Sequence, residues 1–267
     1  MSDQNGQVFV FDFDGVICDS TYECLISSWN TWQRWSNTNE FRTSPENFSN
    51  EEIDSFYAIR PRVRGAGEYF IVESMRSKGI QLRSQQQYDE AVYRNRDQIK
   101  LFKLLFYQER GRLQEFDFQN WLNLHSVYKD VCQFLENFKD SGRLYIATLK
   151  DRKSVSAILT QQGISLSEDH LLDESQIKSK LDALEKIRLQ SNIKPEKITL
   201  FDDNILHLTD PKIFGYQTFL AAWGNVPEES INTAEGANIE VIRDFGSFMQ
   251  NVDQVARLSV YRSESNK

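Results

Sequence analysis

Residues 8–20 read VFVFDFDGVICDS, and this stretch decides the fold of the chain. Its first four residues, Val8 to Phe11, form a β-branched and aromatic run, which predicts a strand buried on both faces of a parallel sheet. The strand ends at Asp12, and Asp14 follows two residues later. Side chains two apart on an extended segment point to the same side, so we expect both carboxylates to face one ligand. Gly15 then permits the sharp exit that a strand end needs.

The rest of the chain predicts an α/β core interrupted by a long helical insertion. From residue 21 to about 124, apolar residues recur at helical spacing, and one long helix is predicted from Gln85 to Arg112. After the insertion, helices alternate with short apolar strands, which indicates a Rossmann-like parallel sheet covered by helices on both faces. We therefore predict a core domain of residues 1–20 and 125–258, an all-helical domain of 21–124 inserted after the first strand, and a frayed tail of 259–267. The strands expected after the insertion are Leu144 to Ala147, Ile198 to Phe201, Thr218 to Ala221 and Glu240 to Ile242.

The composition excludes several classes of protein. Hydrophobic residues make up 40% of the 267 residues and charged residues 26%, which is typical of a soluble globular protein. No stretch approaches the roughly 20 apolar residues that cross a bilayer, so we expect a cytoplasmic protein. The net charge of -8 argues against nucleic acid or an anionic membrane as partner. The three cysteines lack paired metal-ligand spacing, which predicts neither a zinc site nor a disulfide framework. A monomer or small homo-oligomer is expected.

Polar residues follow three of the predicted strands, at the edge of the sheet where open α/β folds bind ligands. They are Asp12 and Asp14, Thr148, and the pair Asp202 and Asp203. Two carboxylates about 5 Å apart repel each other by roughly 3 kcal/mol at an effective dielectric constant of about 20. A hard divalent cation relieves this repulsion, and oxygen ligands with open positions favour Mg²⁺. The sequence therefore predicts a magnesium site, with the Thr148 hydroxyl and a nearby lysine beside it.

These residues also carry a family resemblance. Residues 11–20 resemble the first motif of the haloacid dehalogenase superfamily, in its phosphoglycolate phosphatase and phosphoglucomutase-like branch. Residues 144–148, LYIAT, are similar to the second motif, and residues 198–203, ITLFDD, to the double-aspartate form of the fourth. The third motif is a lysine at the start of a helix. We expect it at Lys180, which has the family's leucine four residues on, and Lys178 is the alternative.

The resemblance implies a Mg²⁺-dependent phosphatase of small phosphorylated metabolites. In that family, the aspartate that matches Asp12 attacks phosphorus and forms an aspartyl-phosphate. The aspartate that matches Asp14 protonates the leaving oxygen and later activates water. By resemblance, Thr148 and Lys180 complete the catalytic set.

The metal ligands implied by the resemblance are the Asp12 carboxylate, the Asp14 backbone carbonyl and Asp202. The family's other common spacing places a second acid at residue 206 or 207, and neither is acidic here. Asp203 is therefore expected to share the metal-binding role with its neighbour. The histidines at 125, 170 and 207 have no common spacing, so we expect structural or surface roles for them.

The helical insertion corresponds to the cap of this branch, which lowers over the active site and carries substrate specificity. It contains a basic cluster of Arg60, Arg62 and Arg64, just before two glycines. Solvated side chains are the default for such a cluster, but by resemblance one arginine would clamp a second anionic group of the substrate. The tryptophans at 29, 32 and 35 are expected to be a packed helix face.

Two other functions stay open at this point. A phosphomutase shares all four motifs and differs in how the cap excludes water, so net release of inorganic phosphate would separate it from a phosphatase. A non-catalytic binding protein that kept the fold is the second alternative. The insertion carries no signature of a particular substrate, and the fold cannot supply one.

Overall fold

The structure of the chain is a computed structural model that describes residues 6–82 and 84–250. The chain divides into two compact units, with the divisions after Asp19 and after Ser126. We call residues 20–126 the helical unit and the remainder the core unit. The assignment of these units as cap and catalytic domain stays a prediction, and the predicted tail of 259–267 lies outside the described residues.

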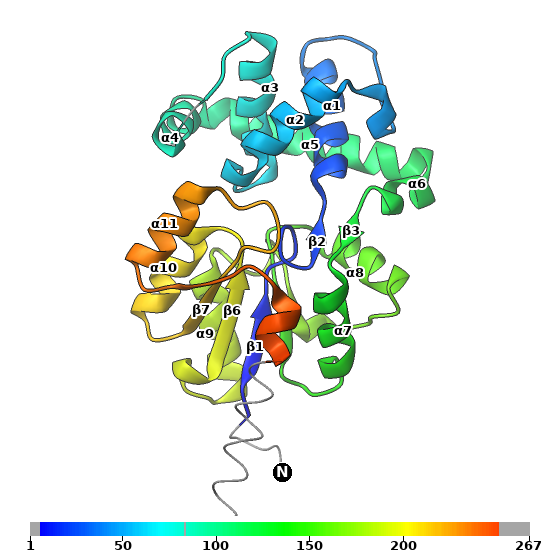
Figure 1. The fold of residues 1–267 in the computed structure, drawn as a ribbon. Coiled ribbons are helices and arrows are strands. Elements are labelled where there is room, and N and C mark those ends of the chain that lie inside the picture. The colour runs from blue at the N-terminus through cyan, green and yellow to red at the C-terminus, as the bar shows by residue number, and fades with distance from the viewer. Residues whose placement is uncertain (1–5, 83, 251–267) are drawn as a thin grey trace, which may run out of the picture. The chain divides into compact units, whose positions relative to one another are not determined.

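The core unit is built on a six-stranded sheet in which every neighbouring pair of strands is parallel, in the order β5-β4-β1-β6-β7-β8 (Figure 1). Phe11, the last residue of β1, pairs with Ile146 on one side and Phe201 on the other, so the three central strands end at the same level. The chain builds outward from β1 first on the β4 side and then on the β6 side, which places the topological switch point at these strand ends. The strands are β1 (Val8–Phe11), β4 (Leu144–Ala147), β5 (Leu171–Leu172), β6 (Ile198–Asp202), β7 (Gln217–Ala221) and β8 (Glu240–Ile242).

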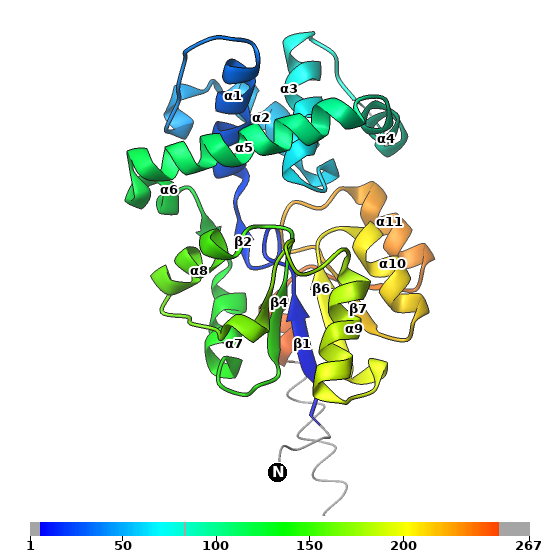
Figure 2. The same ribbon diagram turned by 180° about the vertical axis from the view of Figure 1, so that it is seen from behind.

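The two faces of the sheet follow from the alternation of side chains along β1. Val8 and Val10 belong to an aliphatic cluster that includes buried residues of α9, α10 and α11. Phe9 faces the other way, and its ring centroid lies 5.1 Å from that of Phe134 in α7. Figures 1 and 2 show this sandwich from its two sides. The helices of the core unit are α7 (Lys129–Phe138), α8 (Arg152–Gln161), α9 (Lys180–Ser191), α10 (Ile205–Ile213) and α11 (Glu228–Gly236).

The predicted strands of the core all form. β4 and β8 have the predicted bounds, and β6 and β7 each differ by one residue at one end. The sequence did not indicate β5, because two residues are too few to show a period. It did not indicate α10 either, because Pro211 lies inside that helix and a proline in an apolar run predicts a break.

The helical unit contains six α-helices among its described residues. Ser49 caps α2 as predicted: its side chain accepts the N–H of Glu52 at 3.2 Å, while its own N–H donates to the Glu52 carboxylate at 2.8 Å. The tryptophans of α1 pack as predicted, with Trp29 buried and the Trp35 ring 5.3 Å from Phe70. No helix within the described ranges is both long and apolar enough to cross a membrane. The helices are α1 (Thr21–Trp35), α2 (Asn50–Ile59), α3 (Tyr69–Ser77), α4 (Gln85–Arg94), α5 (Arg96–Phe116) and α6 (Phe118–Asn123).

The single helix predicted from Gln85 to Arg112 is wrong. The chain breaks at Asn95, which ends α4 and begins α5. The Asn95 side chain donates a hydrogen bond to the carbonyl of Ala91 at 2.7 Å, which is the local competition that makes asparagine a helix boundary. α5 then continues through Gly111, where the helix was predicted to stop.

Candidate active site

Asp12 is the first residue beyond β1, and the sheet holds its backbone. Its N–H donates to the carbonyl of Phe201 at 2.9 Å. The side chain is only 12% exposed, and its Oδ1 accepts the N–H of Phe13 at 2.6 Å and a hydrogen bond from the ammonium of Lys180 at 2.8 Å. Burial raises the pKa of Asp12 above its ordinary value, while Lys180 acts in the opposite direction. Within the described part of the chain both donors reach Oδ1, so Oδ2 keeps its lone pairs for a ligand.

Lys180 is the first residue of α9, and the start of that helix fixes its position. Ser179 caps the helix by accepting the N–H of Asp182 at 3.1 Å. The buried ammonium lies 3.1 Å from the Asp202 carboxylate and donates to the carbonyl of Ala147 at 2.5 Å, besides its contact with Asp12. Burial opposes its charge, but the two aspartates raise the pKa of Lys180 overall. Lys178, the sequence alternative, is exposed. The structure thus places Lys180 beside Asp12, and its catalytic role stays a prediction.

Asp202 is the last residue of β6 and is fully buried. Its Oδ1 accepts the N–H of Asn204 at 2.9 Å, and its Oδ2 faces Lys180. The imidazole Nδ1 of His207 lies 3.1 Å from Oδ1 and 3.2 Å from Oδ2. Burial alone would raise the pKa of Asp202, but Lys180, His207 and the Asn204 N–H lower it to about 2. The carboxylate is therefore ionised at neutral pH.

Asp14 and Thr148 lie at the same edge, and Lys150 contacts both. The Lys150 ammonium lies 3.2 Å from Asp14 Oδ1, and the lysine side chain is 1% exposed against 23% for the aspartate. The N–H of Lys150 donates to the Thr148 hydroxyl oxygen at 3.1 Å. This leaves the Thr148 O–H to donate to a ligand. The partly open Asp14 carboxylate is thus supported from inside the protein by a buried cation.

Asp203 takes a different position from Asp202. It follows β6 on a bend, and its carboxylate packs against the backbone of Gly15, where an added Cβ would collide with it. Gly15 also has a φ of 81°, so this residue must be a glycine for two reasons. Asp203 is not among the three side chains, Asp12, Asp202 and His207, that lie close enough to bind one ion. Its part in metal binding stays a prediction.

Three side chains at this edge are close enough to bind one metal ion. Asp12, Asp202 and His207 each offer a ligand atom, and these atoms all lie within 4.8 Å of one another. Carboxylate oxygens together with an imidazole nitrogen suit a divalent cation. The charge balance also favours a bound cation, because the four aspartates of this edge outnumber the ammonium groups of Lys180 and Lys150. The residues present therefore fit a divalent cation, with one nitrogen beside the oxygen ligands that the sequence predicted.

The comparison with known families shows the family of the chain. Residues 7–208 match the family described as haloacid dehalogenase-like hydrolase. The chain belongs to this family. The match spans the core strands from β1 to β6 and the helical insertion, and it confirms the resemblance drawn from residues 11–20. A comparison with curated proteins gives no significant match.

Several solved structures have the same fold. A predicted phosphoglycolate phosphatase from Haemophilus somnus 129PT is 17% identical with a TM-score of 0.59, over 94% of this chain and 100% of that one. A hydrolase from Pseudomonas syringae is 12% identical with a TM-score of 0.58, over 93% and 99%. A hydrolase of the family from Deinococcus radiodurans R1, with bound phosphate and sodium, is 12% identical with a TM-score of 0.56, over 95% and 98%.

Sequence reasoning missed two residues of the site in this haloacid dehalogenase-like hydrolase. Lys150 follows Thr148 by two residues, and that spacing was the available signal. His207 was expected to have a structural or surface role, yet its ring faces Asp202. It stands at one of the two positions where the family's other spacing has a second acid. The sequence analysis noted only that no acid is present there and did not consider histidine as a replacement.

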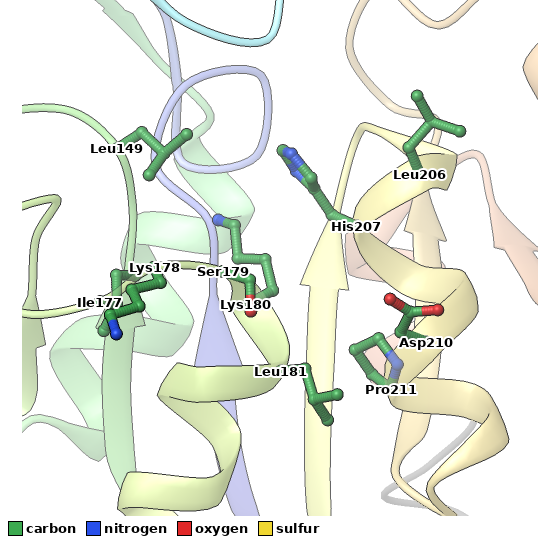
Figure 3. A pocket seen from close by; sticks show the side chains of 10 residues that line it. All are labelled: Leu149, Ile177, Lys178, Ser179, Lys180, Leu181, Leu206, His207, Asp210 and Pro211. Atoms are coloured by element: carbon green, nitrogen blue, oxygen red, sulfur yellow. The ribbon is translucent and has the colours of Figure 1, made fainter.

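A cavity of about 150 Å³ adjoins the site. Figure 3 shows Lys180 and His207 extending into its upper part from the first turns of α9 and α10. Leu149 and Leu206 provide apolar walls, and Lys178 and Asp210 are further lining residues.

The three arginines predicted to bind substrate lie in the helical unit. Arg64 is already paired, with its guanidinium 3.1 Å from Glu68 and 3.0 Å from Asp89. Arg60 and Arg62 bound a short 3-10 turn, and Arg62 donates to the carbonyl of Ala58 at 3.2 Å. A substrate-clamping role for any of them stays a prediction, and Arg64 would have to leave two carboxylates to take it.

Proposed function

We propose that this haloacid dehalogenase-like hydrolase is a metal-dependent phosphatase of small phosphorylated metabolites, with Asp12 as nucleophile. The observation that carries the proposal is the environment of Asp12. This buried carboxylate has one oxygen bound by two donors and the other without a donor among the described residues. Asp202 and Lys180 lie beside it, and Asp14 lies two residues on. Such an arrangement is costly for folding and suits the binding of a phosphoryl group.

In the first step, Oδ2 of Asp12 attacks phosphorus, and the bond from phosphorus to the ester oxygen breaks. The leaving oxygen takes a proton from the Asp14 carboxyl, whose partly exposed position allows contact with substrate. The Thr148 hydroxyl and the Lys180 ammonium donate to the phosphoryl oxygens, where negative charge collects. The product of this step is an aspartyl-phosphate and a free alcohol.

In the second step, Asp14 takes a proton from water, and the water oxygen attacks the phosphorus of the aspartyl-phosphate. The bond from phosphorus to Asp12 breaks, and inorganic phosphate leaves. A carboxylate nucleophile thus divides one difficult displacement into two easier ones. Lys150 holds the Asp14 side chain in place through both proton transfers.

A bound divalent cation supplies charge neutralisation for the phosphoryl oxygens and for the carboxylates around them. Mg²⁺ is the ion expected from the family, with Asp12, Asp202 and the Asp14 backbone carbonyl as its ligands. We assign the choice of substrate to the helical unit. The family match and the predicted phosphatase among the solved structures support this function.

A screen of the purified protein against sugar, nucleotide and small organic phosphates tests the proposal. Each substrate is assayed with a divalent cation and with chelator, beside an Asp12→Asn control. We expect metal-dependent release of inorganic phosphate that the control loses. Transfer between positions of one substrate without net phosphate release would instead indicate a phosphomutase, and activity in the control would exclude Asp12 as nucleophile.

A further inference from the structure

His207 departs from the all-oxygen ligand set expected for Mg²⁺. It is the third residue of α10, and α10 begins three residues after Asp202 through a turn in which the Asn204 side chain caps the helix. That turn directs the imidazole back toward the strand end. Its Nδ1 faces Asp202, and no other contact of the ring with the described residues competes for that nitrogen.

The distances at Asp202 fit two ligands of one ion. Nδ1 lies 3.1 and 3.2 Å from the two carboxylate oxygens, so it is nearly equidistant from them. Ligands about 2.1 Å from one ion, in adjacent octahedral positions, lie about 3 Å apart. The Asp12 carboxylate completes the group within 4.8 Å.

We propose that His207 is a metal ligand through Nδ1, and that it moves the preference of the site from Mg²⁺ toward later first-row transition-metal ions such as Co²⁺ and Ni²⁺. The physical reason is ligand type: imidazole suits the later first-row ions, whose affinity for nitrogen ligands rises from Mn²⁺ through Co²⁺ to Ni²⁺, whereas carboxylate, carbonyl and water suit Mg²⁺. The inference deepens the proposed function, because it names the class of metal that the same site uses. It also assigns a role to the position where the family's other spacing has an acid.

The chain offers matched variants for a test. His207→Asp supplies an acid at that position, so that every side-chain ligand of the site is an oxygen atom. His207→Asn is a second variant in case the first does not fold. His170→Gln is the control, because His170 lies at the other end of β4, where its Nδ1 is 2.8 Å from the carbonyl of Leu144. Thermal unfolding of the metal-free proteins checks that each variant folds.

Electron spin echo envelope modulation of bound Mn²⁺ detects a coordinated nitrogen, and equilibrium binding measures the affinities for Co²⁺ and Mg²⁺. We expect coordinated nitrogen in the wild type and in His170→Gln, and none in His207→Asp or His207→Asn. The ratio of Co²⁺ to Mg²⁺ affinity should fall at least about tenfold in His207→Asp, as replacement of imidazole by carboxylate implies. Metal bound to the wild type without a nitrogen signal, or no bound metal at all, overturns the inference.

Phosphatase activity is measured separately on the same samples. Nitrogen-coordinated Mn²⁺ in a protein that releases no phosphate would uphold the role of His207 and reject the proposed function. Phosphate release by a wild type without the nitrogen signal would reject the role of His207 and leave the proposed function standing.

Discussion

The helical unit and the core unit both bury carboxylates, but they neutralise them differently. In the helical unit, Glu23 accepts two hydrogen bonds from the Arg110 guanidinium, each 2.8 Å long, and a third from the Ser27 hydroxyl at 2.6 Å. Glu73 is likewise held by Arg76, at 2.6 and 3.0 Å. Each buried acid here has an arginine and satisfied oxygens.

In the core unit, Asp12 and Asp202 share a single lysine ammonium. Asp202 also contacts the Asn204 N–H and His207 Nδ1, but one oxygen of Asp12 has no donor among the described residues. A planar guanidinium, by contrast, satisfies both oxygens of one carboxylate. The comparison separates charges that stabilise a fold from charges kept for a ligand. The same kind of substitution should therefore affect stability in one unit and activity in the other.

The largest effect is expected from Asp12→Asn. Loss of the nucleophile should lower kcat by at least about 10⁴-fold, as for nucleophiles that act within a catalytic group. The metal-free variant should unfold at no lower temperature than the wild type, because one of two buried like charges has gone. Phosphate release and calorimetry measure the two quantities. A folded variant with near-normal kcat would contradict the comparison.

Glu23→Gln should instead lower the stability of the protein and change kcat little. It leaves the Arg110 guanidinium buried and unbalanced, which should cost about 3–5 kcal/mol of unfolding free energy. Denaturant unfolding measures this cost. The matched control is Glu90→Gln in the same unit, since Glu90 and Arg94 form an exposed pair at 3.5 Å and such pairs contribute at most about 1 kcal/mol. Equal costs in the two variants would remove the distinction drawn here.

Lys180→Met should lower kcat by about 10²–10³-fold, the usual effect of removing one preorganised donor. Lys178→Met, two residues away and exposed, is the control and should change kcat little. The pair decides between the two lysines that the sequence left open. If Lys178→Met were the more damaging change, the assignment of the third motif would be wrong.

Metal should stabilise the core unit through these same carboxylates. Mn²⁺ at about 100 times its dissociation constant should raise the unfolding free energy by about 2.7 kcal/mol. Asp202→Asn should lose most of this gain, because it removes a ligand oxygen of the site. Thermal unfolding with and without the ion measures the gain, and an undiminished gain in Asp202→Asn would place the ion elsewhere.

The smallest effect concerns Lys150, which acts through Asp14. Lys150→Met should lower kcat for an alkyl phosphate about tenfold more than for p-nitrophenyl phosphate, whose leaving group needs little help from a general acid. Lys153→Met, exposed on the next helix, is the control. Equal losses for the two substrates would mean that Lys150 only supports the fold.

The sequence predicted the core well because its signals are local. The run from Val8 to Phe11 alternates valine with phenylalanine and is followed by aspartates. The strands beside it are short apolar runs with clear ends. Elements whose formation depends on tertiary contacts could not be predicted, such as the two-residue β5 and the proline-containing α10. The break at Asn95 escaped because the apolar period continues across it.

The candidate site divides in the same way. Asp12, Asp14, Thr148, Lys180 and Asp202 follow strands or begin a helix, and the structure gathers them at one edge. The contact of Lys150 with Asp14 joins residues 136 apart in the chain, so the spacing of Lys150 from Thr148 could not show it. His207 is only five residues from Asp202, but whether its ring turns toward that carboxylate depends on where the next helix begins. Asp203 stood beside Asp202 in sequence, but adjacent residues leave a strand end in different directions.

Capture of the covalent intermediate is the most direct test of the central claim that Asp12 is the nucleophile. A reactive substrate identified in the screen is mixed with enzyme, the reaction is quenched in acid within the first turnover, and the peptides are analysed by mass spectrometry. We predict a phosphoryl group on the peptide that contains Asp12, and none in the Asp12→Asn protein. Full phosphate release with no phosphoryl group on Asp12 at any time of quenching would contradict the account.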